Sequence, residues 1–442
     1  MITRIESYNY RCFENLAVDL SGFHVLAGAN GSGKSTLLDI PVLLGELMRA
    51  ERVEDAFLQP SPRTGRPPRA QSLAEPAHRG REGGFGFALE ARLPTEVTEV
   101  IAEATRDPRL PLPTHLRYEL HLAPLDQGRG IGIAGEYLVL FPEEHPVRPV
   151  PGERAFEDPD EKKVTGRGGS RRVRWVWEEE WRPVIARTGG PVARFTSEIG
   201  GQPPLSWQSP QSRLALDTVP FDAAQFPAAL WFRGLLRERT LAYAPDWASL
   251  RQAAQPAGRT PQLDAGGRNT PWLALRLQRE DKELYDAWVD LVRIALPQIE
   301  EIDVVEREDD HHAYFRVTYA GGHQVTSSGL SDGTLRVFAL TLLAFAPDPP
   351  ALLVTEEPEN GIYPQAIEIV MQALQAVRDS QVLVATQSPL VLANAELSDV
   401  LATRVDHDTG AVTVVRGDRH PRLADWRGDL DLGTLFATGV FE

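Results

Sequence analysis

Residues 28–36, GANGSGKST, are the first group whose types and spacing could do defined chemistry. Closely spaced glycines let backbone N–H groups converge on phosphate oxygens, and a following helix adds its positive N-terminal end. The spacing fits the phosphate-binding pattern G-x-x-x-x-G-K-[ST], in which Lys34 would reach the β- and γ-phosphates and Ser35 would bind Mg²⁺. The alternative is a chance glycine-rich turn, but an apolar strand pattern precedes the loop and a helical pattern follows it. The predicted nucleotide-binding residues are Asn30, Gly31, Ser32, Gly33, Lys34, Ser35 and Thr36.

A second group, EEPENG at 356–361, places two carboxylates directly after the apolar segment ALLVT. Adjacent residues leaving a strand point to opposite sides, so the two acids can serve different roles. Bound Mg²⁺ needs an acid to hold its water shell, and hydrolysis needs an acid to position or deprotonate the attacking water. We assign Glu356 to the metal and Glu357 to the water. A charged corner between strand and loop is the alternative, and the phosphate loop disfavours it.

Two further polar segments follow apolar or helical patterns. The segment LSDGT places Ser331 and Gly333 at the start of an apolar helix, where anions bind favourably. The residues alone leave two interpretations open: an ordinary helix cap, or a contact to phosphate bound by a neighbouring subunit. The segment QVLVATQSP ends a buried strand with Gln387 and Ser388.

The elements that must position these residues alternate between strand and helix patterns. Strand patterns at 23–28, 351–358 and 381–389, the last two ending in polar residues, are separated by helical spacing, including 363–377. This alternation predicts the α/β class with a mostly parallel sheet. Ligands of such sheets bind at the carboxyl ends of the strands, where the phosphate loop, both acids and Gln387 all fall.

Taken in order, GANGSGKST, LSDGT, LLVTEEPENGIYP and VATQSP resemble the motifs of ABC-class ATPases. They are most similar to the non-transporter branch: RecF-like and SMC-like ATPases and the ATPase halves of OLD-type defence proteins, the AAA family ATPases of prokaryotic defence systems. The opening segment ITRIESYNYRCFENL also resembles the start of that branch. The resemblance covers about residues 1–40 and 268–395, and it is weak or absent over 45–260.

The resemblance implies an ABC-type P-loop fold that hydrolyses ATP to ADP and phosphate, with ATP and Mg²⁺ as cofactors. Glu356 takes the Walker B position and Glu357 that of the catalytic base. Ser331 and Gly333 would reach across a head-to-tail dimer to the γ-phosphate bound by the other protomer. The loop after the acids, PENG at 358–361, would signal between the two sites, and Arg11 would approach the nucleotide.

Two departures from the family pattern bear on the chemistry. The Walker B acid is Glu356 rather than aspartate, which gives it a longer reach. The switch histidine is replaced by Gln387, whose amide can donate to a γ-phosphate but cannot carry a proton or a charge. We therefore expect slow turnover with a weak pH dependence. The glutamine of the lobe-linking loop has no clear position, with Gln59 and Gln71 as candidates.

The chain is expected to divide into five segments around these motifs. The segment 46–225 is an insert, a proline- and arginine-rich loop followed by an antiparallel β subdomain with strands near 85–93, 115–123, 137–141 and 171–181. Helical spacing at 228–240 and 271–296 predicts a helical lobe over 226–300. The segments 1–45 and 301–395 form the ATPase core, and 396–442 is a hairpin and tail, which leaves little room for a nuclease domain.

Composition bounds the function. The 442 residues are 42% hydrophobic and 24% charged, which is typical of a globular protein, and the single cysteine, Cys12, excludes an internal disulfide. The formal charge of −16 disfavours bulk attraction to nucleic acid, so DNA contact would need the basic segment 162–177. A half-buried strand explains that segment equally well. Asp309 to His312 read as a hairpin turn rather than a metal site. We expect a cytoplasmic protein without a membrane span.

The favoured hypothesis is an ATP-driven switch that dimerises through composite sites. It would gate a separate effector, a nuclease or toxin, in a prokaryotic anti-phage defence or DNA-surveillance system. A nucleotide-gated DNA clamp in repair is the alternative. A transporter ATPase subunit is less favoured, because some 300 residues separate the phosphate loop from LSDGT.

Overall fold

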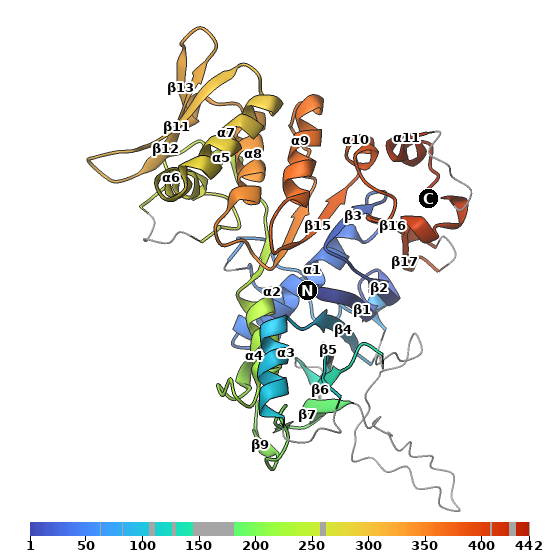
Figure 1. The fold of residues 1–442 in the computed structure, drawn as a ribbon. Coiled ribbons are helices and arrows are strands. Elements are labelled where there is room, and N and C mark those ends of the chain that lie inside the picture. The colour runs from blue at the N-terminus through green and yellow to red at the C-terminus, as the bar shows by residue number, and fades with distance from the viewer. Residues whose placement is uncertain are drawn as a thin grey trace, which may run out of the picture. The chain divides into compact units, whose positions relative to one another are not determined.

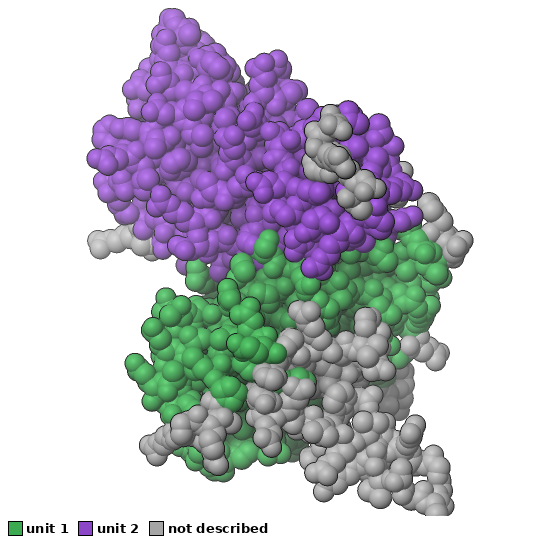
Figure 2. Space-filling model, turned by 45° about the vertical axis from the view of Figure 1, so that its right-hand side comes forward, with its two compact units in different colours: residues 1–21, 39–239, 405–414 green, residues 22–38, 240–404, 415–442 purple. Residues whose placement is uncertain are grey.

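The structure is a computed structural model, and it divides the chain into two compact units (Figures 1 and 2). Unit 1 comprises residues 1–21, 39–239 and 405–414, and unit 2 comprises residues 22–38, 240–404 and 415–442. The structure describes residues 1–61, 63–81, 83–105, 111–125, 130–144, 181–256, 262–406, 409–423 and 430–441.

A six-stranded sheet organises unit 2, and its strands run β10-β14-β15-β3-β16-β17 across the sheet. Each neighbouring pair from β10 to β16 is parallel. The predicted α/β class with a mostly parallel sheet is therefore confirmed. The bounds of these strands are β3 Phe23–Ala27, β10 Thr240–Ala242, β14 Leu352–Glu356, β15 Gln381–Thr386, β16 Val400–Val405 and β17 Val412–Arg416.

The strand order explains where the polar motifs meet. The first strand of this sheet in the chain, β3, lies between β15 and β16, which come about 360 residues later. The phosphate loop follows β3, the paired acids end β14, and Gln387 follows β15. Three motifs that are far apart in the sequence therefore leave the same edge of one sheet.

Helices and a small second sheet complete unit 2. Helices α8 and α9 pack on each other, and α6 and α7 precede a three-stranded antiparallel sheet, β11-β12-β13 (Figure 1). The helices are α5 Trp247–Leu250, α6 Thr270–Glu280, α7 Lys282–Ala295, α8 Asp332–Thr341, α9 Pro364–Gln375, α10 Pro389–Ala393 and α11 Leu432–Ala437. The strands are β11 Ile299–Glu306, β12 Ala313–Tyr319 and β13 Gln324–Thr326.

The single helical stretch expected at 271–296 is two helices. The break falls at Asp281, whose side chain caps α7 by accepting a hydrogen bond from the backbone N–H of Leu284 at 3.1 Å. An N-cap aspartate satisfies one of the free N–H groups of a helix start, so it ends one helix and begins the next. Apolar periodicity alone does not reveal such a break.

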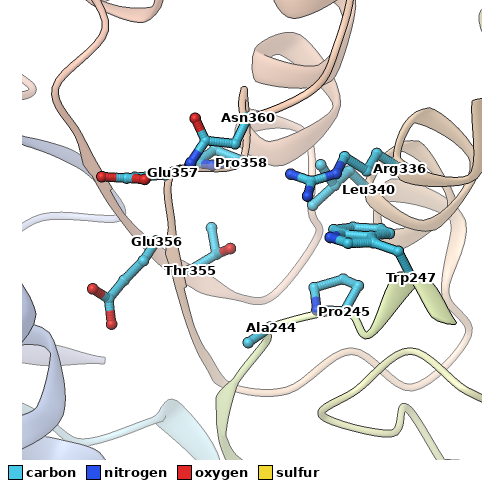
Figure 3. A pocket seen from close by; sticks show the side chains of 10 residues that line it. All are labelled: Ala244, Pro245, Trp247, Arg336, Leu340, Thr355, Glu356, Glu357, Pro358 and Asn360. Carbon is cyan, nitrogen blue, oxygen red and sulfur yellow. Dashed lines mark hydrogen bonds between the residues drawn. The ribbon is translucent and has the colours of Figure 1, made fainter. Parts of the chain in front are cut away.

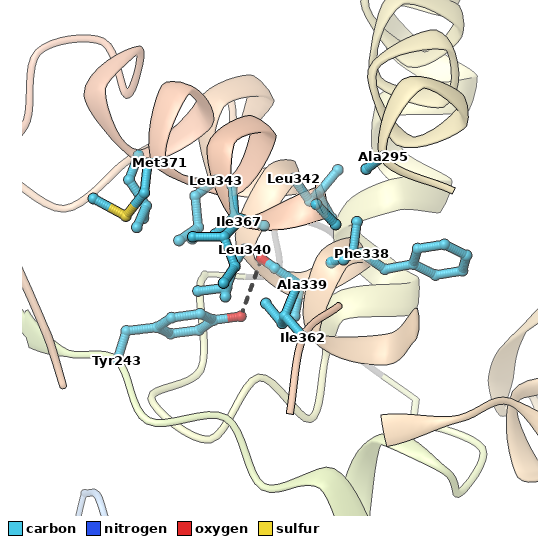
Figure 4. Close-up of a cluster of buried hydrophobic side chains, with 14 of the residues drawn as sticks. Tyr243, Ala295, Phe338, Ala339, Leu340, Leu342, Leu343, Ile362, Ile367 and Met371 are labelled. Carbon is cyan, nitrogen blue, oxygen red and sulfur yellow. Dashed lines mark hydrogen bonds between the residues drawn. The ribbon is translucent and has the colours of Figure 1, made fainter. Parts of the chain in front are cut away.

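The core of unit 2 gathers apolar side chains from α7, α8 and α9 (Figure 4). Phe338 of α8 is fully buried, and Trp288 of α7 meets it edge to face with ring centroids 5.8 Å apart. Tyr243, just after β10, is also buried, and its hydroxyl donates to the backbone carbonyl of Ala339 at 3.3 Å. Each such side chain stabilises the fold by about 1.5–3 kcal/mol, so this core fixes α8 against the sheet.

Unit 1 is built on an eight-stranded sheet whose strand order is β2-β1-β4-β5-β6-β7-β8-β9. All its neighbouring pairs are antiparallel. The strands are β1 Ile2–Tyr10, β2 Phe13–Asp19, β4 Phe85–Arg92, β5 His115–Pro124, β6 Ile131–Phe141, β7 Arg182–Thr188, β8 Val192–Phe195 and β9 Leu205–Gln208. The expected antiparallel strands of the insert are present near 85–93, 115–123 and 137–141.

The N-terminal strands join this antiparallel sheet. Strand β1 pairs with β4 of the insert, for example Ile5 opposite Leu89. This pairing differs from the expected grouping of residues 1–45 with the ATPase core, because the register of distant strands leaves no local sign in the sequence. The strand expected at 171–181 lies outside the described residues except for Trp181. The five-segment division of the chain stays a prediction.

Three of the described helices belong to unit 1. A longer helix, α1, starts in unit 2 and ends in unit 1. Helix α1, Lys34–Arg49, follows the phosphate loop and is helical through Pro41, as expected. The helices of unit 1 are α2 Asp55–Leu58, α3 Thr95–Ala104 and α4 Pro227–Arg237. Of the helices in the expected lobe at 226–300, α4 belongs to unit 1, whereas α6 and α7 belong to unit 2.

Candidate nucleotide site

The phosphate loop has the backbone that its glycines allow. Gly31 and Gly33 have φ angles of 77° and 87°, left-handed values that residues with a side chain rarely adopt. Asn30 and Gly31 are exposed at the tip of the loop. The loop therefore presents backbone, rather than side chains, at the carboxyl end of β3, as a phosphate cradle requires.

Lys34 begins α1 and folds back over the loop. Its ammonium donates to the backbone carbonyls of Gly28 at 2.6 Å and Ala29 at 2.9 Å. Burial lowers the pKa of Lys34, and the carboxylates of Glu357 and Glu356 oppose that shift. The loop carbonyls thus hold the cation at the position where phosphate oxygens would compete for it.

The base of the loop rests on a residue that sequence analysis missed, Thr403 of β16. The Thr403 hydroxyl donates to the carbonyl of Ala27 at 3.0 Å and lies 2.6 Å from the hydroxyl of Ser32. Because the Thr403 proton is used on Ala27, Ser32 donates to Thr403. A Cβ atom on Gly28 would lie 2.0 Å from the Thr403 hydroxyl oxygen, so only glycine fits there.

Thr403→Val is expected to weaken nucleotide binding without unfolding the protein. Valine keeps the branched shape but leaves the buried Ser32 hydroxyl without its acceptor, which costs about 1–3 kcal/mol. If about half of that free-energy cost is lost from the binding free energy of ATP, the Kd for a fluorescent ATP analogue rises about 3- to 10-fold. Thr403→Ser retains the hydroxyl and should bind like the parent. A valine variant with unchanged Kd would contradict this role.

The proposed metal ligands are in contact. The hydroxyl of Ser35 donates to the carboxylate of Glu356, which joins the end of the phosphate loop to the end of β14. Among the described residues, no cluster of three or more His, Cys, Asp or Glu side chains could hold a metal ion. One hydroxyl and one carboxylate fit the way Mg²⁺ is held with phosphates and water. The metal assignment of Ser35 and Glu356 stays a prediction.

Glu357 has a strained backbone and a fully engaged carboxylate. Its φ is +46°, which is uncommon for a residue with a side chain, and its N–H donates to the carbonyl of Ala385 at 2.7 Å. The carboxylate accepts a hydrogen bond from the Gln387 amide at 2.7 Å and another from the Asn360 amide. The predicted base and the predicted switch residue, taken from two different motifs, are therefore direct neighbours.

Glu359 is a third acid at this site, to which sequence analysis gave no role. It is only 8% exposed, and one carboxyl oxygen accepts from the hydroxyl of Thr386. Its other oxygen is buried and has no hydrogen-bond partner among the described residues. Burial raises the pKa of Glu359, and the bond from Thr386 opposes that shift. The Thr386 hydroxyl also accepts from the N–H of Ser388 at 2.9 Å, so Glu359 is tied to the backbone around Gln387.

The raised pKa of Glu359 predicts a pH-dependent stability. A carboxyl group whose pKa rises on folding stabilises the fold below the unfolded pKa, about 4.3, and this contribution is lost as pH rises through the folded pKa. From pH 5 to pH 8 the urea midpoint should therefore fall more for the parent than for Glu359→Gln, because glutamine mimics the protonated acid. Glu359→Ala loses the bond to Thr386 and should cost about 1–3 kcal/mol at pH 5, and less at pH 8, where the parent has lost part of this contribution.

The exposed Glu368→Gln serves as the control, since Glu368 lies on the outer face of α9. Equal midpoint changes with pH in the parent and in Glu359→Gln would show that Glu359 does not titrate in this way.

Ser331 is the N-cap of α8. Its hydroxyl accepts from the N–H of Thr334 at 3.1 Å, which confirms the capping interpretation. The residue is also exposed, so capping and a contact to a neighbouring subunit are compatible. A Cβ atom on Gly333 would lie 2.7 Å from the carbonyl oxygen of Gly361. The roles of Ser331 and Gly333 toward a nucleotide stay predictions.

A pocket in unit 2 opens beside the paired acids (Figure 3). Its volume is about 380 Å³. The segment that leaves β10 contributes Ala244, Pro245 and Trp247 to it, and α8 contributes Arg336 and Leu340. This segment links the sheet to α6, and no glutamine is among the residues that line the pocket. The position of the lobe-linking glutamine therefore stays open. The candidates Gln59 and Gln71 are residues of unit 1. The lining residues are Ala244, Pro245, Trp247, Arg336, Leu340, Thr355, Glu356, Glu357, Pro358 and Asn360.

Three other expectations from the sequence fall outside this cluster. Arg11 is a residue of unit 1, where its guanidinium donates to the carbonyl of Arg69 at 2.6 Å, and its approach to a nucleotide stays a prediction. The segment 309–312 is the turn between antiparallel strands β11 and β12, as expected. The basic segment 162–177 lies outside the described residues.

The parallel sheet, the phosphate loop after β3 and the paired acids after β14 together have the arrangement of a P-loop nucleotide-binding fold, the fold that the resemblance implied. Residues 228–393 match the model of a family described as "AAA domain, putative AbiEii toxin, Type IV TA system". The matched stretch is less than half of the chain, and it contains α8, the paired acids and Gln387. No curated protein matches the chain.

The fold has remote neighbours among solved structures. One is an SMC head bound to the C-terminal winged-helix domain of ScpA, with a TM-score of 0.47 and 14% identity, covering 94% of this chain and 97% of that one. A second is the Smc head domain with an extended coiled coil bound to the C-terminal domain of ScpA, from Pyrococcus furiosus. Its TM-score is 0.44 and its identity 13%, and the match covers 94% of this chain and 95% of that one. A third is the SMC head domain from Thermotoga maritima. Its TM-score is 0.35 and its identity 12%, and the match covers 94% of this chain and 98% of that one.

No helix within the described part of the chain is long and apolar enough to cross a membrane.

Proposed function

We propose that this protein binds and hydrolyses ATP as a molecular switch, dimerises through composite nucleotide sites, and gates a separate effector. The effector would be a nuclease or toxin of a prokaryotic anti-phage defence or DNA-surveillance system. The observation that carries the proposal is the cluster in which the phosphate loop contacts Glu356 through Ser35, while Glu357 contacts Gln387. These contacts bring together, at one sheet edge, the groups to which we assign phosphate binding, metal binding and water activation.

The roles follow from the contacts. Lys34 would exchange the carbonyls of Gly28 and Ala29 for phosphate oxygens, and Ser35 and Glu356 would hold Mg²⁺. The metal, when bound, offsets the charge that develops on the phosphates. Glu357 orients the attacking water and takes its proton. The Gln387 amide has two N–H donors, so it can keep one on Glu357 and direct the other to the γ-phosphate.

Exposed apolar residues beside the site support self-association. Tyr363, two residues after the loop 358–361, is 65% exposed, and Leu390, three residues after Gln387, is 46% exposed. Together with the exposed cap residue Ser331, they provide an apolar and polar surface of the kind that dimer interfaces use. The family description names a toxin–antitoxin system, which supports an effector partner for this chain.

The alternative function is a nucleotide-gated DNA clamp for repair. Its support is the basic segment 162–177 in the sequence, because arginines contribute to binding through phosphate contacts. DNA binding at moderate salt that disappears when Arg171, Arg172 and Arg174 are neutralised would favour this alternative over effector gating.

The proposed function is tested by measuring ATP turnover and mass in the same preparation. We expect a low turnover number and a monomer-to-dimer shift with ATP but not with ADP, both abolished in Lys34→Ala. Lys282→Ala is the matched control, because Lys282 is an exposed helix residue paired with Asp286 at 3.1 Å. A parent protein that neither hydrolyses ATP nor changes mass with ATP would refute the proposal.

A further inference from the structure

Arg336 has an unusual environment on α8. Its guanidinium carbon lies 3.9 Å from the ring centroid of Trp247, a close cation–π stack. Its Nε atom is buried and has no hydrogen-bond partner within the described chain. An arginine that lacks a partner at this atom is held here by the aromatic ring rather than by a carboxylate. Figure 3 shows the stack facing the acid loop across the pocket.

The stack lies against the acid loop at Gly361. A Cβ atom on Gly361 would lie 3.5 Å from the Nε of Arg336. Gly361 has a φ of +74°, so the loop turns sharply at this point. The start of α8 touches the same residue, since a Cβ atom on Gly333 would lie 2.7 Å from the Gly361 carbonyl oxygen. Helix α8 therefore contacts the acid loop at two points one turn apart.

Trp247, the aromatic member of the stack, lies in the segment that follows β10. Strand β10 pairs in parallel with β14, the strand that ends in the acids. Trp247 begins α5, which Asp246 caps through the N–H of Ala248 at 3.2 Å. The same segment makes a second contact with α8. Arg251 donates through Nε and Nη2 to one oxygen of Asp332 at 3.0 and 2.8 Å.

We propose that the Trp247–Arg336 stack is a positioning clamp that fixes the acid loop, 358–361, to the start of α8. This inference rests on the proposed function and deepens it. The acid loop carries Asn360, which holds Glu357, whereas the start of α8 carries Ser331. The clamp therefore makes the base of one site and the residue offered to a second site move together. The residues act through Glu357 and Ser331 and do not touch the reacting atoms.

A positioning clamp has a kinetic signature that simple packing lacks. The phosphate loop belongs to a different strand, β3, so ATP affinity does not depend on the stack. Loss of the clamp should lower kcat while the KM and Kd for ATP stay within about twofold. A small misplacement of a catalytic group costs up to about 100-fold in rate, so we expect kcat to fall about 10- to 100-fold in Arg336→Ala and Trp247→Ala.

The test compares both alanine variants with Trp247→Phe, Arg336→Lys and the double alanine variant. Phenylalanine keeps a ring and lysine keeps a cation, so each should recover most of kcat. The double variant should be no slower than the worse single variant, because the two residues act as one unit. Arg293→Ala is the matched control, since Arg293 is a half-exposed helix arginine paired locally with Asp290.

The clamp is overturned if the alanine variants keep the parent kcat and lose only thermal stability, or if they raise KM with kcat unchanged. Additive losses in the double variant would also overturn it. If the alanine variants do not fold, the phenylalanine and lysine variants decide: kcat reduced as far as in Glu357→Gln refutes the clamp. The proposed function is judged separately by parent turnover and its loss in Glu357→Gln.

Discussion

Replacing Glu357 with glutamine is expected to lower ATP turnover by at least about 100-fold, because general-base catalysis by a positioned carboxylate contributes about 10²–10⁴-fold. Glutamine has the length of glutamate, and its amide oxygen can still accept from Gln387 or Asn360, which now hold the carboxylate. The site should therefore keep its shape while losing the group that takes the proton. Lys34, Ser35 and Glu356 are untouched, so ATP should still bind.

The same variant should accumulate as an ATP-bound dimer. If bound ATP holds two protomers together and they dissociate only after hydrolysis, a variant that cannot hydrolyse ATP should stay dimeric. The expected readouts are near-stoichiometric ATP retained after gel filtration and a dimer mass that persists. Glu368→Gln on the exposed face of α9 is the matched control and should behave like the parent.

Parent-like turnover by Glu357→Gln would move the catalytic base elsewhere, and Glu359 and Glu356 are the other acids of the same motif. Loss of turnover together with loss of bound ATP would instead give Glu357 a role in binding. Only retained ATP with lost turnover supports the assignment of Glu357 as the base.

The sequence predicted the parts of this site that depend on short spacing. The phosphate loop, the two acids after β14 and the polar end of β15 are local patterns, because phosphate and metal binding need particular atoms within a few residues of one another. Parallel strands bring their carboxyl ends to one edge, so the gathering of these motifs was also predictable. The prediction of an α/β fold with a mostly parallel sheet therefore succeeded without any long-range information.

The parts that could not be predicted depend on which strands become neighbours. Thr403 supports the phosphate loop only because β16 lies beside β3, and a threonine in an apolar segment carries no sign of that role. Trp247 lines the same pocket as the acid loop because β10 pairs with β14, although some 110 residues separate them. The glutamine sought at 59 or 71 was a guess for the same reason, since the linking segment could not be located before the strand order was known.

The antiparallel sheet gives a second example. Strand β1 alternates in burial as a surface strand does, yet its partner β4 begins some 75 residues later. Arg117 of β5 is 1% exposed because it bonds to Glu6, Glu90 and Glu119 of the same sheet. Charged residues in a strand usually predict a solvated face, so only the register explains why this arginine can be buried.

The second prediction with a large expected effect concerns the composite site. Ser331→Arg should abolish hydrolysis while leaving the Kd of the monomer for ATP unchanged, because the bulky cation blocks the surface offered to a second subunit. Arginine also removes the cap of α8, which costs about 1 kcal/mol. Ser331→Ala removes only the cap, so it separates the two effects and should retain most of the ability to dimerise.

Mixing two inactive variants tests the head-to-tail arrangement directly. Lys34→Ala lacks a working phosphate loop, and Ser331→Arg lacks a working contact for its partner's nucleotide. In a mixed dimer one site joins the intact loop of the Ser331→Arg chain to the intact Ser331 of the Lys34→Ala chain. Only the mixed dimer contains an intact composite site, one of its two, so turnover should return in the mixture and reach at most about half of the parent activity.

The control for this mixture places both lesions in one chain and mixes that chain with the parent protein. Every site of the resulting mixed dimers then contains one lesion, so activity should come only from parent dimers. Turnover by Ser331→Arg without any partner variant would mean that each protomer hydrolyses ATP alone. In that case Ser331 would be an ordinary helix cap, which its bond to Thr334 already permits, and the switch would need another way to join two subunits. Recovery in the first mixture alone requires that Ser331 of one chain serve Lys34 of another.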